Sequence, residues 1–155
     1  MKIISLGMGV QSTALYLMSS LGYIERADYA IYADLKSEKP TTEDLIKYLL
    51  EWKKLNNGIE ILIEEADIYQ DVINGVNSYG KSFVTIPAFS ESGGMVQRQC
   101  TGEYKINTVK KRIRDLHGLK YKQRMKPTEL WLGISTDEIE RAKVSQTYNV
   151  EYKYL

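Results

Sequence analysis

Residues 2–63 alternate between short apolar runs and helical patterns, and this alternation constrains the fold more than any other feature of the sequence. Apolar runs stand at 2–6, 29–33 and 59–63, and each is typical of a buried strand. The intervals between them carry apolar residues at spacings of three and four, which predict helices. Strands that alternate with helices in this way form a parallel sheet covered by the helices. We therefore expect an α/β fold.

Capping residues indicate where the first two helices begin and end. The first helix is expected to follow the turn at residues 7–11, to be capped by Ser12 and to end at Gly22. The second is expected to begin at Thr41 and to stop at residues 57–58, an Asn-Gly pair. The connections to the strands are then short, as they are in βαβ units.

The second half of the chain continues the pattern less regularly. Residues 77–97 have no clear period, which is typical of a functional loop or of a disordered segment. The other expected elements are a short helix at 67–76, a helix at 103–116, a strand at 130–134, a helix capped by Ser135 or Thr136, and a strand at 150–155. Together these predict one domain over residues 1–155, with an open, mostly parallel sheet of about four to five strands and helices on both faces.

Length and composition exclude several classes of protein. A chain of 155 residues buries enough surface to fold without disulfides or metals. Cys100 and His117 are the only cysteine and histidine, so neither an intramolecular disulfide nor a metal site with paired histidines is available. No apolar run reaches the length of a membrane span, and the N-terminus lacks the pattern of a signal peptide. We expect a cytoplasmic protein without a membrane partner.

The net charge of +1 hides an uneven distribution. Residues 98–126 contain ten basic residues and two acidic ones, a net charge of +8, so the rest of the chain carries −7. This asymmetry indicates an anionic partner for the basic segment, such as a second substrate. The alternative is a solvated helix face without a partner.

The candidate chemistry gathers where strands are expected to end, because ligands of open α/β sheets bind at the carboxyl ends of the strands. In the turn after the first strand, Gly7 and Gly9 let backbone N–H groups approach an anion, and the following helix adds free N–H donors. The turn lacks the third glycine of the dinucleotide fingerprint and the lysine of the Walker loop. Two glycines in such a turn are also compatible with a structural role alone.

Two further groups of residues are expected at the same edge. Asp34, followed by Glu38, suits a ribose hydroxyl or a magnesium ion, or it caps the turn after its strand. Arg98 and Lys105 flank Cys100 at the start of the basic helix and suit a phosphate or sulfate. Cys100 is either a thiol of lowered pKa near a helix N-terminus or a small buried apolar residue.

Four segments, in chain order, resemble the motifs of a known superfamily. They are residues 5–15, residues 32–34 with Glu38 and Pro40, residues 98–101 with 104–106, and residues 131–138 with Arg141 and Lys143. They are similar to the phosphoadenosine phosphosulfate (PAPS) reductase-like branch of the adenine nucleotide alpha-hydrolase superfamily, also called PP-loop ATP pyrophosphatases, including forms carried by bacteriophages. The resemblance covers nearly the whole chain and implies the HUP-type variant of the α/β fold.

The resemblance implies an ATP-type adenine nucleotide, with Mg²⁺, and no iron–sulfur cluster. The implied nucleotide-binding residues are Ser5, Gly7, Gly9, Gln11, Ser12, Thr13, Asp34, Glu38, Gly133, Ser135, Asp137 and Arg141, with Asp34 also the metal ligand. The implied catalytic residues are Cys100, Arg98 and Lys105. The phosphates would lie on the turn, and the adenosine against the second strand.

The chain also departs from the family pattern. Gln11 stands where adenylating members usually carry aspartate, and Leu35-Lys36 replaces the usual Thr-Gly. The chain ends at Leu155 without the family's C-terminal cysteine segment, so we expect either a compact form or a fragment. The preferred hypothesis is an enzyme that transfers a nucleotidyl or sulfur group. The alternatives are a protein that binds or sequesters the nucleotide without turnover, and a component that modifies tRNA or DNA; a homo-oligomer is compatible with each.

Overall fold

The computed structural model describes residues 1–76, 88–89, 95–96, 101–120, 122–135 and 147–155, together with residues 137, 140, 142, 144 and 145. The strands of its main sheet are β1 (Lys2–Ser5), β2 (Tyr29–Asp34), β3 (Ile61–Glu65), β6 (Thr128–Leu132) and β7 (Val150–Tyr154). In the described part of the chain they form a five-stranded sheet in the order β3-β2-β1-β6-β7, and each neighbouring pair is parallel. The predicted α/β class is confirmed, and the sheet is wholly rather than mostly parallel.

The helices and the minor sheet complete the described elements. They are α1 (Val10–Leu21), α2 (Pro40–Asn56), α3 (Ile68–Ile73), a π-helical segment η1 (Thr101–Ile106) that continues into α4 (Asn107–Leu116), and the strands β4 (Ala88–Phe89) and β5 (Met95–Val96), which pair antiparallel. Within the described ranges, no helix combines the length and the apolar character that crossing a membrane requires.

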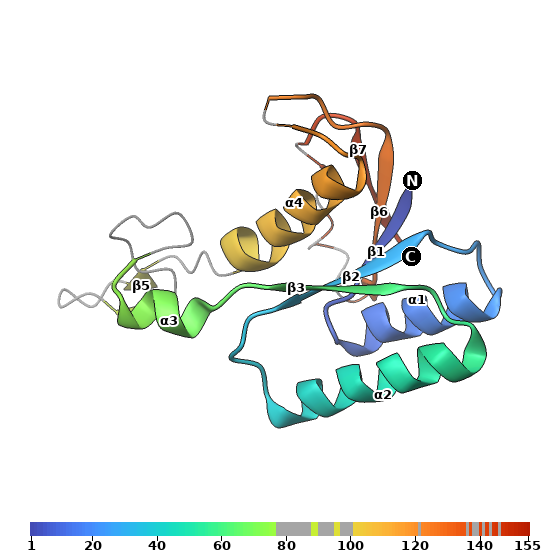
Figure 1. Ribbon diagram of the computed structural model, residues 1–155, viewed down its shortest axis with the longest axis horizontal. Helices are drawn as coiled ribbons and strands as arrows, with labels where there is room; N and C mark the ends of the chain where they lie inside the picture. The colour runs from blue at the N-terminus through green and yellow to red at the C-terminus, as the bar shows by residue number, and fades with distance from the viewer. Residues whose placement is uncertain are drawn as a thin grey trace.

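The order of the strands decides which face each helix covers. From β1 the chain moves through α1 to β2 and through α2 to β3, always in one direction across the sheet, whereas β6 lies on the other side of β1. Because parallel crossovers are right-handed, helices on the two sides of this reversal lie on opposite faces. Figure 1 shows α1 and α2 beneath the sheet and α4 above it. The prediction of helices on both faces is correct.

Alternation along the strands builds a core on each face. Ile4 and Trp131 belong to the core under α1 and α2, and their neighbours Ile3 and Leu130 belong to the core under α4. All four are at most 3% exposed. Tyr16 of α1 is fully buried, and its hydroxyl donates to the carbonyl of Ile59 over 2.9 Å, so its one polar atom is satisfied. Two layers of helices therefore bury both faces of the strands β1, β2 and β6.

The first helix begins earlier than the sequence indicated. Gly9, not Ser12, is the N-cap of α1, with φ −86° and ψ 167°. Ser12 lies inside the first turn, where its hydroxyl donates to the carbonyl of Gly9 over 3.1 Å instead of accepting a backbone N–H. The expected end is correct, since Gly22 takes a left-handed conformation with φ 80° and its N–H donates to the carbonyl of Met18.

The observed bounds of α2 and β3 also differ from the expected ones, and each difference has a physical reason. Helix α2 begins at Pro40, whose missing N–H costs nothing at the first helical position. It ends at Asn57, as expected, in a left-handed conformation with φ 50°. Strand β3 was expected at 59–63, but it lies two residues later, at Ile61–Glu65, because its register with β2 pairs Ile61 with Ala30 and Glu65 with Asp34. Pairing with a neighbour, which hydropathy does not report, sets the end of this strand.

The basic helix was expected at 103–116, and the structure divides it. The π-helical turn η1 precedes α4, which buries Val109 and Ile113 against the sheet, whereas Ile106 at the end of η1 is 40% exposed. Most of the expected loop at 77–97 and most of the helix expected after Ser135 lie outside the described residues.

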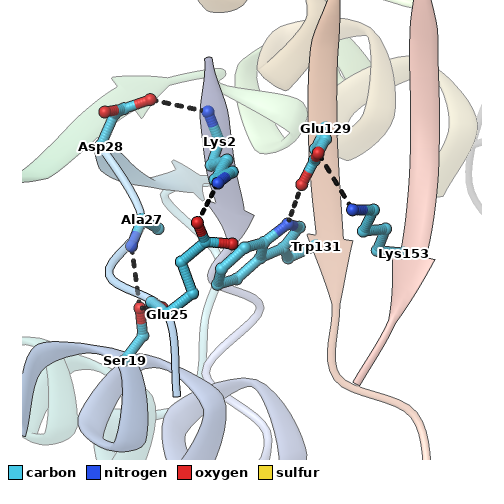
Figure 2. Close-up of polar contacts among 8 residues, drawn as sticks. All are labelled: Lys2, Ser19, Glu25, Ala27, Asp28, Glu129, Trp131 and Lys153. Atoms are coloured by element: carbon cyan, nitrogen blue, oxygen red, sulfur yellow. Dashed lines mark hydrogen bonds and ion pairs between the residues drawn. The ribbon is translucent and has the colours of Figure 1, made fainter. Parts of the chain in front are cut away.

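Polar side chains link neighbouring segments near the amino ends of β1 and β6 (Figure 2). The candidate residues instead lie at the carboxyl ends of the strands. Lys2 donates its backbone N–H to Asp28 over 2.7 Å and its ammonium to Glu25. Glu129 of β6 accepts from the indole N–H of Trp131 and from the ammonium of Lys153, each over 3.0 Å. The Lys153 ammonium and the Trp131 N–H lower the pKa of Glu129, which keeps this link between β6 and β7 ionised at neutral pH.

Candidate functional site

The candidate site lies between β1 and β6, where the order in which the chain adds strands to the sheet reverses direction. β1 and β6 are parallel neighbours, with Ile4 beside Trp131, so the segments that follow them emerge side by side. The segment after β1 continues into α1 beneath the sheet, whereas α4 covers the opposite face (Figure 1). Such switch points leave a crevice between the diverging segments, and ligands of doubly wound folds bind there.

The turn from β1 to α1 presents its backbone to this crevice. Leu6 is buried and donates its N–H to the carbonyl of Ile31 over 2.9 Å, which fixes the start of the turn. Met8 takes a positive φ of 57° while its side chain enters the core, and Gly7 and Gly9 on either side are exposed. A bulky residue in this conformation is strained, and such strain gathers at ligand-binding turns.

The two glycines of the turn have no structural requirement that the described residues reveal. A Cβ added to Gly7 would meet Ser12 Oγ at 3.9 Å, and one added to Gly9 would meet Gln11 Oε1 at 3.8 Å, as the nearest described atoms. Both are ordinary van der Waals distances, and neither glycine has a positive φ. The described residues therefore leave open space in front of the backbone of the turn.

The start of α1 favours an anion electrostatically. Its N-cap is a glycine without a side-chain hydrogen bond, and residues 10–13 include no carboxylate. The first N–H groups of a helix have no partner within the helix and carry a partial positive charge. Thr13 adds a buried hydroxyl oxygen that has no hydrogen-bond partner within the described residues. Donors are thus present without an internal acid to neutralise them.

The segment after β6 packs directly against this helix start. A Cβ on Gly133 would lie 2.6 Å from both the carbonyl carbon of Gln11 and the amide nitrogen of Ser12, closer than any side chain allows. Two residues later, Ser135 accepts a hydrogen bond from the Gln11 side-chain amide over 3.4 Å. The structure therefore brings together residues from distant segments that the family resemblance implied in one site: Gly9, Gln11, Ser12, Gly133 and Ser135.

Asp34 has the contacts of a turn-capping residue. Its carboxylate accepts the backbone N–H of Lys36 over 2.9 Å and pairs with the Lys36 ammonium over 3.1 Å. The same ammonium contacts Glu65 at the end of β3 over 2.7 Å. Within the described ranges, no three potential ligands of the His, Cys, Asp and Glu types gather around a common point. With one oxygen on an N–H and the other beside an ammonium, Asp34 does not fit a magnesium ligand as it stands.

Lys105 was predicted to supply a positive charge, and the structure pairs it with an acid. Its ammonium lies 3.1 Å from Glu38, a carboxylate in the loop between β2 and α2. A phosphate contact by Lys105 would therefore have to share or break this ion pair. The pair connects η1, on the α4 side of the sheet, to the end of β2, so it holds the basic segment at the candidate edge.

The β2 side of the edge is acidic. Tyr32 is 4% exposed, and its pKa is raised to about 12, first by burial and then by the nearby carboxylates of Glu38 and Asp34. A phosphate group would be repelled by the same carboxylates. The turn before α1 is consequently the better place for phosphates, and the β2 side suits hydroxyl or amine groups that donate hydrogen bonds to carboxylates.

The remaining predicted residues have less defined positions. Ser5 ends β1 and is partly buried, and Asp137 is exposed. Arg98, Cys100 and Arg141 lie outside the described residues, so their predicted roles are untested.

Sequence analysis did not single out Glu65 or the pairing role of Lys36. A signal for Glu65 was present, because acidic residues directly follow the strands expected at 29–33 and 59–63, and the ends of such strands meet at one edge of a parallel sheet. No signal in the sequence indicated that Lys36 would adopt a positive φ of 56° and fold back onto Asp34.

A hollow of about 840 Å³ runs along β7 and past Met1. None of its described lining residues belongs to the turn at residues 7–13 or to the segment around Gly133 and Ser135.

The fold and the edge define a doubly wound, parallel α/β protein with an anion-favouring turn at its switch point. Comparison of the chain with protein-family models finds no match. Comparison with curated proteins and with solved structures likewise finds no match. The case for a function therefore depends on the chain's own residues.

Proposed function

We propose that this protein binds an adenine nucleotide, with the phosphates on the turn at residues 7–13. The observation that carries the proposal is the open backbone at Gly7 and Gly9 beside an uncapped helix start. Side chains would fit at both positions without a clash inside the described chain, so the exposed N–H groups are accessible to a ligand. Anions bind at such helix starts because free N–H groups and the helix dipole act together.

The location of the carboxylates supports one orientation of the nucleotide. Asp34, Glu38 and Glu65 gather at the β2–β3 side, about Tyr32 and Lys36, whereas residues 10–13 carry no acid. A phosphate chain on the turn at residues 7–13 would avoid these acids, and a ribose near β2 would donate its hydroxyls to them. The motifs of the PAPS reductase-like branch, quoted above, imply the same orientation and the HUP-type variant of the fold.

The proposed activity is transfer of a nucleotidyl or sulfur group on this nucleotide, in the PAPS reductase-like class of PP-loop proteins. Arg98 would bind the outer phosphate or sulfate, and Cys100 would be the nucleophile. Magnesium, when bound, would neutralise phosphate charge; because Asp34 is occupied by Lys36, we assign it no ligand from this chain. The alternative is nucleotide binding without turnover, which the occupied Lys105 and Asp34 favour.

Calorimetric titration with ATP, ADP and PAPS tests the binding proposal. Gly9→Val should weaken the affinity at least tenfold, because its side chain would enter the space in front of the turn. The melting temperature of the variant should change little, since a Cβ at Gly9 meets its nearest described atom at 3.8 Å. Equal affinity in a folded variant, or no binding of any of the three nucleotides by the parent protein, would rule out the proposed site.

Product analysis then separates an enzyme from a binding protein. If the protein is an enzyme, chromatography should show AMP and pyrophosphate after incubation with ATP, or adenosine 3′,5′-bisphosphate after incubation with PAPS. In the second case the sulfuryl group would pass to the Cys100 thiolate as its S–O bond to that leaving group breaks. Cys100→Ser should abolish this turnover and leave the affinity intact, and Arg98→Ala should weaken binding about ten- to a hundredfold. Tight binding without products would support the binding alternative.

A further inference from the structure

The largest cluster of positive charges in the described part of the chain lies on α4 and the turn after it, away from the turn at residues 7–13. Between residues 110 and 126, eight Lys and Arg residues stand against a single carboxylate, Asp115. Arg112 is neutralised by Glu64 of β3 at 3.2 Å. We call the other seven cations the basic surface: Lys110, Lys111, Arg114, Lys120, Lys122, Arg124 and Lys126.

Packing of α4 determines where these cations lie. Val109 and Ile113 are buried against the sheet, on the face opposite α1 and α2 (Figure 1). Lys111 is exposed on the same helix, and Lys120 and Lys126 are exposed in the turn that follows it. A helix of ten residues is about 15 Å long, so the basic surface extends from near the Lys105–Glu38 pair to the opposite edge of the sheet.

Part of the basic surface is a hollow with a cationic lining. It has a volume of about 520 Å³ and is lined by Arg114, Lys122, Arg124, Leu119 and Gln123, with no carboxylate among the described residues that line it. Arg114 is held in place by hydrogen bonds to the carbonyls of Lys120, over 2.8 Å, and Gln123, over 3.0 Å. A positioned guanidinium binds an oxyanion at a lower entropic cost than a free one does.

An aromatic residue lies beside the hollow. Arg124 stands over the ring of Tyr148, with its guanidinium carbon 5.4 Å from the ring centroid, and Tyr148 is 62% exposed. No aromatic residue interleaves with the cations between Lys110 and Arg114, so this part of the helix itself offers no ring on which a base could stack. The fold supplies one from a distant segment. Exposed aromatic and Arg side chains together are the usual surface on which unpaired bases stack.

We propose that the basic surface binds the phosphate backbone of a single-stranded nucleic acid, with a base stacking at Tyr148. An acidic protein is the weaker fit, because protein interfaces are depleted in lysine and have an apolar centre. The basic surface instead contains five lysines and two arginines. Contacts of Lys and Arg with phosphates are the ordinary source of sequence-independent binding.

Fluorescence anisotropy with labelled 20-nucleotide RNA and DNA, from 50 to 200 mM salt, tests the proposal. The test variant is Lys111→Gln with Lys120→Gln, because neither side chain makes a hydrogen bond or ion pair with the described residues. The control is Lys47→Gln with Lys54→Gln on α2, on the other face of the sheet. Lys47 lies 3.7 Å from Asp44, but both side chains are largely exposed, so this ion pair contributes little. The test variant should bind about tenfold more weakly at low salt, and its slope of log affinity against log salt should fall by about 1.4.

The outcomes decide the proposal in both directions. Tyr148→Ala should weaken single-strand binding about fivefold or more and leave duplex binding nearly unchanged. Binding of RNA, of DNA or of both supports the proposal and identifies the nucleic acid. The proposal is overturned if the parent protein binds neither RNA nor DNA at 50 mM salt, or if the α2 control loses as much affinity as the test variant. It is also overturned if polyaspartate binds more tightly than the nucleic acids do. ATP affinity, measured on the same variants, should not change, so failure here leaves the nucleotide site standing.

Discussion

Gly133 and Ser12 lie so close that a Cβ on Gly133 would be 2.6 Å from the Ser12 amide nitrogen. The contact joins the end of β6 to the first turn of α1, at the point where the strand order reverses direction. Because backbone meets backbone, no side-chain rotation could relieve a clash. A glycine at this position is therefore a condition for bringing the Ser135 segment against the turn at residues 7–13.

Gly133→Ala should destabilise the protein. Overpacking of this kind typically costs about 1–3 kcal/mol, and here the atoms that must move are the backbone of Gln11 and Ser12. Urea denaturation followed by circular dichroism measures the free energy of unfolding. The matched control is Gly7→Ala, whose added Cβ would lie 3.9 Å from the nearest described atom. It should stay within about 0.5 kcal/mol of the parent. Equal stability of the two variants would contradict the contact.

The parallel sheet could be predicted because its signals are local. Strands β1 and β2 are short apolar runs, and Gly22 and Asn57 are the left-handed residues that end the helices between them. Helix α4 was predictable from the spacing of Val109 and Ile113. These features depend on hydropathy and backbone preference, which a sequence displays directly.

The site could be predicted only in part, because its contacts join distant segments. The motifs placed Gln11 and Ser135 in one site, and the structure places them 3.4 Å apart. The sequence did not show that Lys105 would pair with Glu38, or that Lys36 would turn back onto Asp34. The first pairing depends on how η1 packs against the loop after β2, and the second on a positive φ at Lys36. Residue type alone determines neither.

Tyr32→Phe should make the protein more resistant to alkaline unfolding. The pKa of Tyr32 is raised to about 12, mainly by burial, whereas an unfolded tyrosine titrates near 10. Between these values the unfolded state binds fewer protons, so stability falls as pH rises, by roughly 2–3 kcal/mol in total. Urea denaturation at pH 9 and pH 11 should show that the variant loses less stability than the parent. An identical loss in both proteins would be incompatible with a neutral, buried Tyr32.

Lys126→Gln should raise the pKa of His117. Burial lowers this pKa first, and the charge of Lys126 lowers it further, so the helix end holds a mostly neutral imidazole rather than the cation that favours a helix C-terminus. The imidazole contacts Thr128 Oγ1 at 2.8 Å. Stability is then fully present above pH 6.5 and declines as pH falls through the folded pKa. Since His117 is the single histidine, its NMR titration is unambiguous. Lys120→Gln is the charge-matched control, and an equal shift in both variants would exclude a specific Lys126 effect.

Lys36→Gly should be more stable than Lys36→Ala, the reverse of the usual order. Both variants lose the ion pairs of Lys36 with Asp34 and Glu65, which are partly exposed and contribute little. They differ at the backbone, because φ is 56° at this position and a Cβ there costs about 1 kcal/mol or more. Lys47, inside α2, provides the opposite case, where Gly should be about 1 kcal/mol less stable than Ala. Four free energies of unfolding therefore test the turn that occupies Asp34. If Ala exceeds Gly at both positions, Lys36 does not hold the left-handed conformation, and Asp34 is free to bind a ligand.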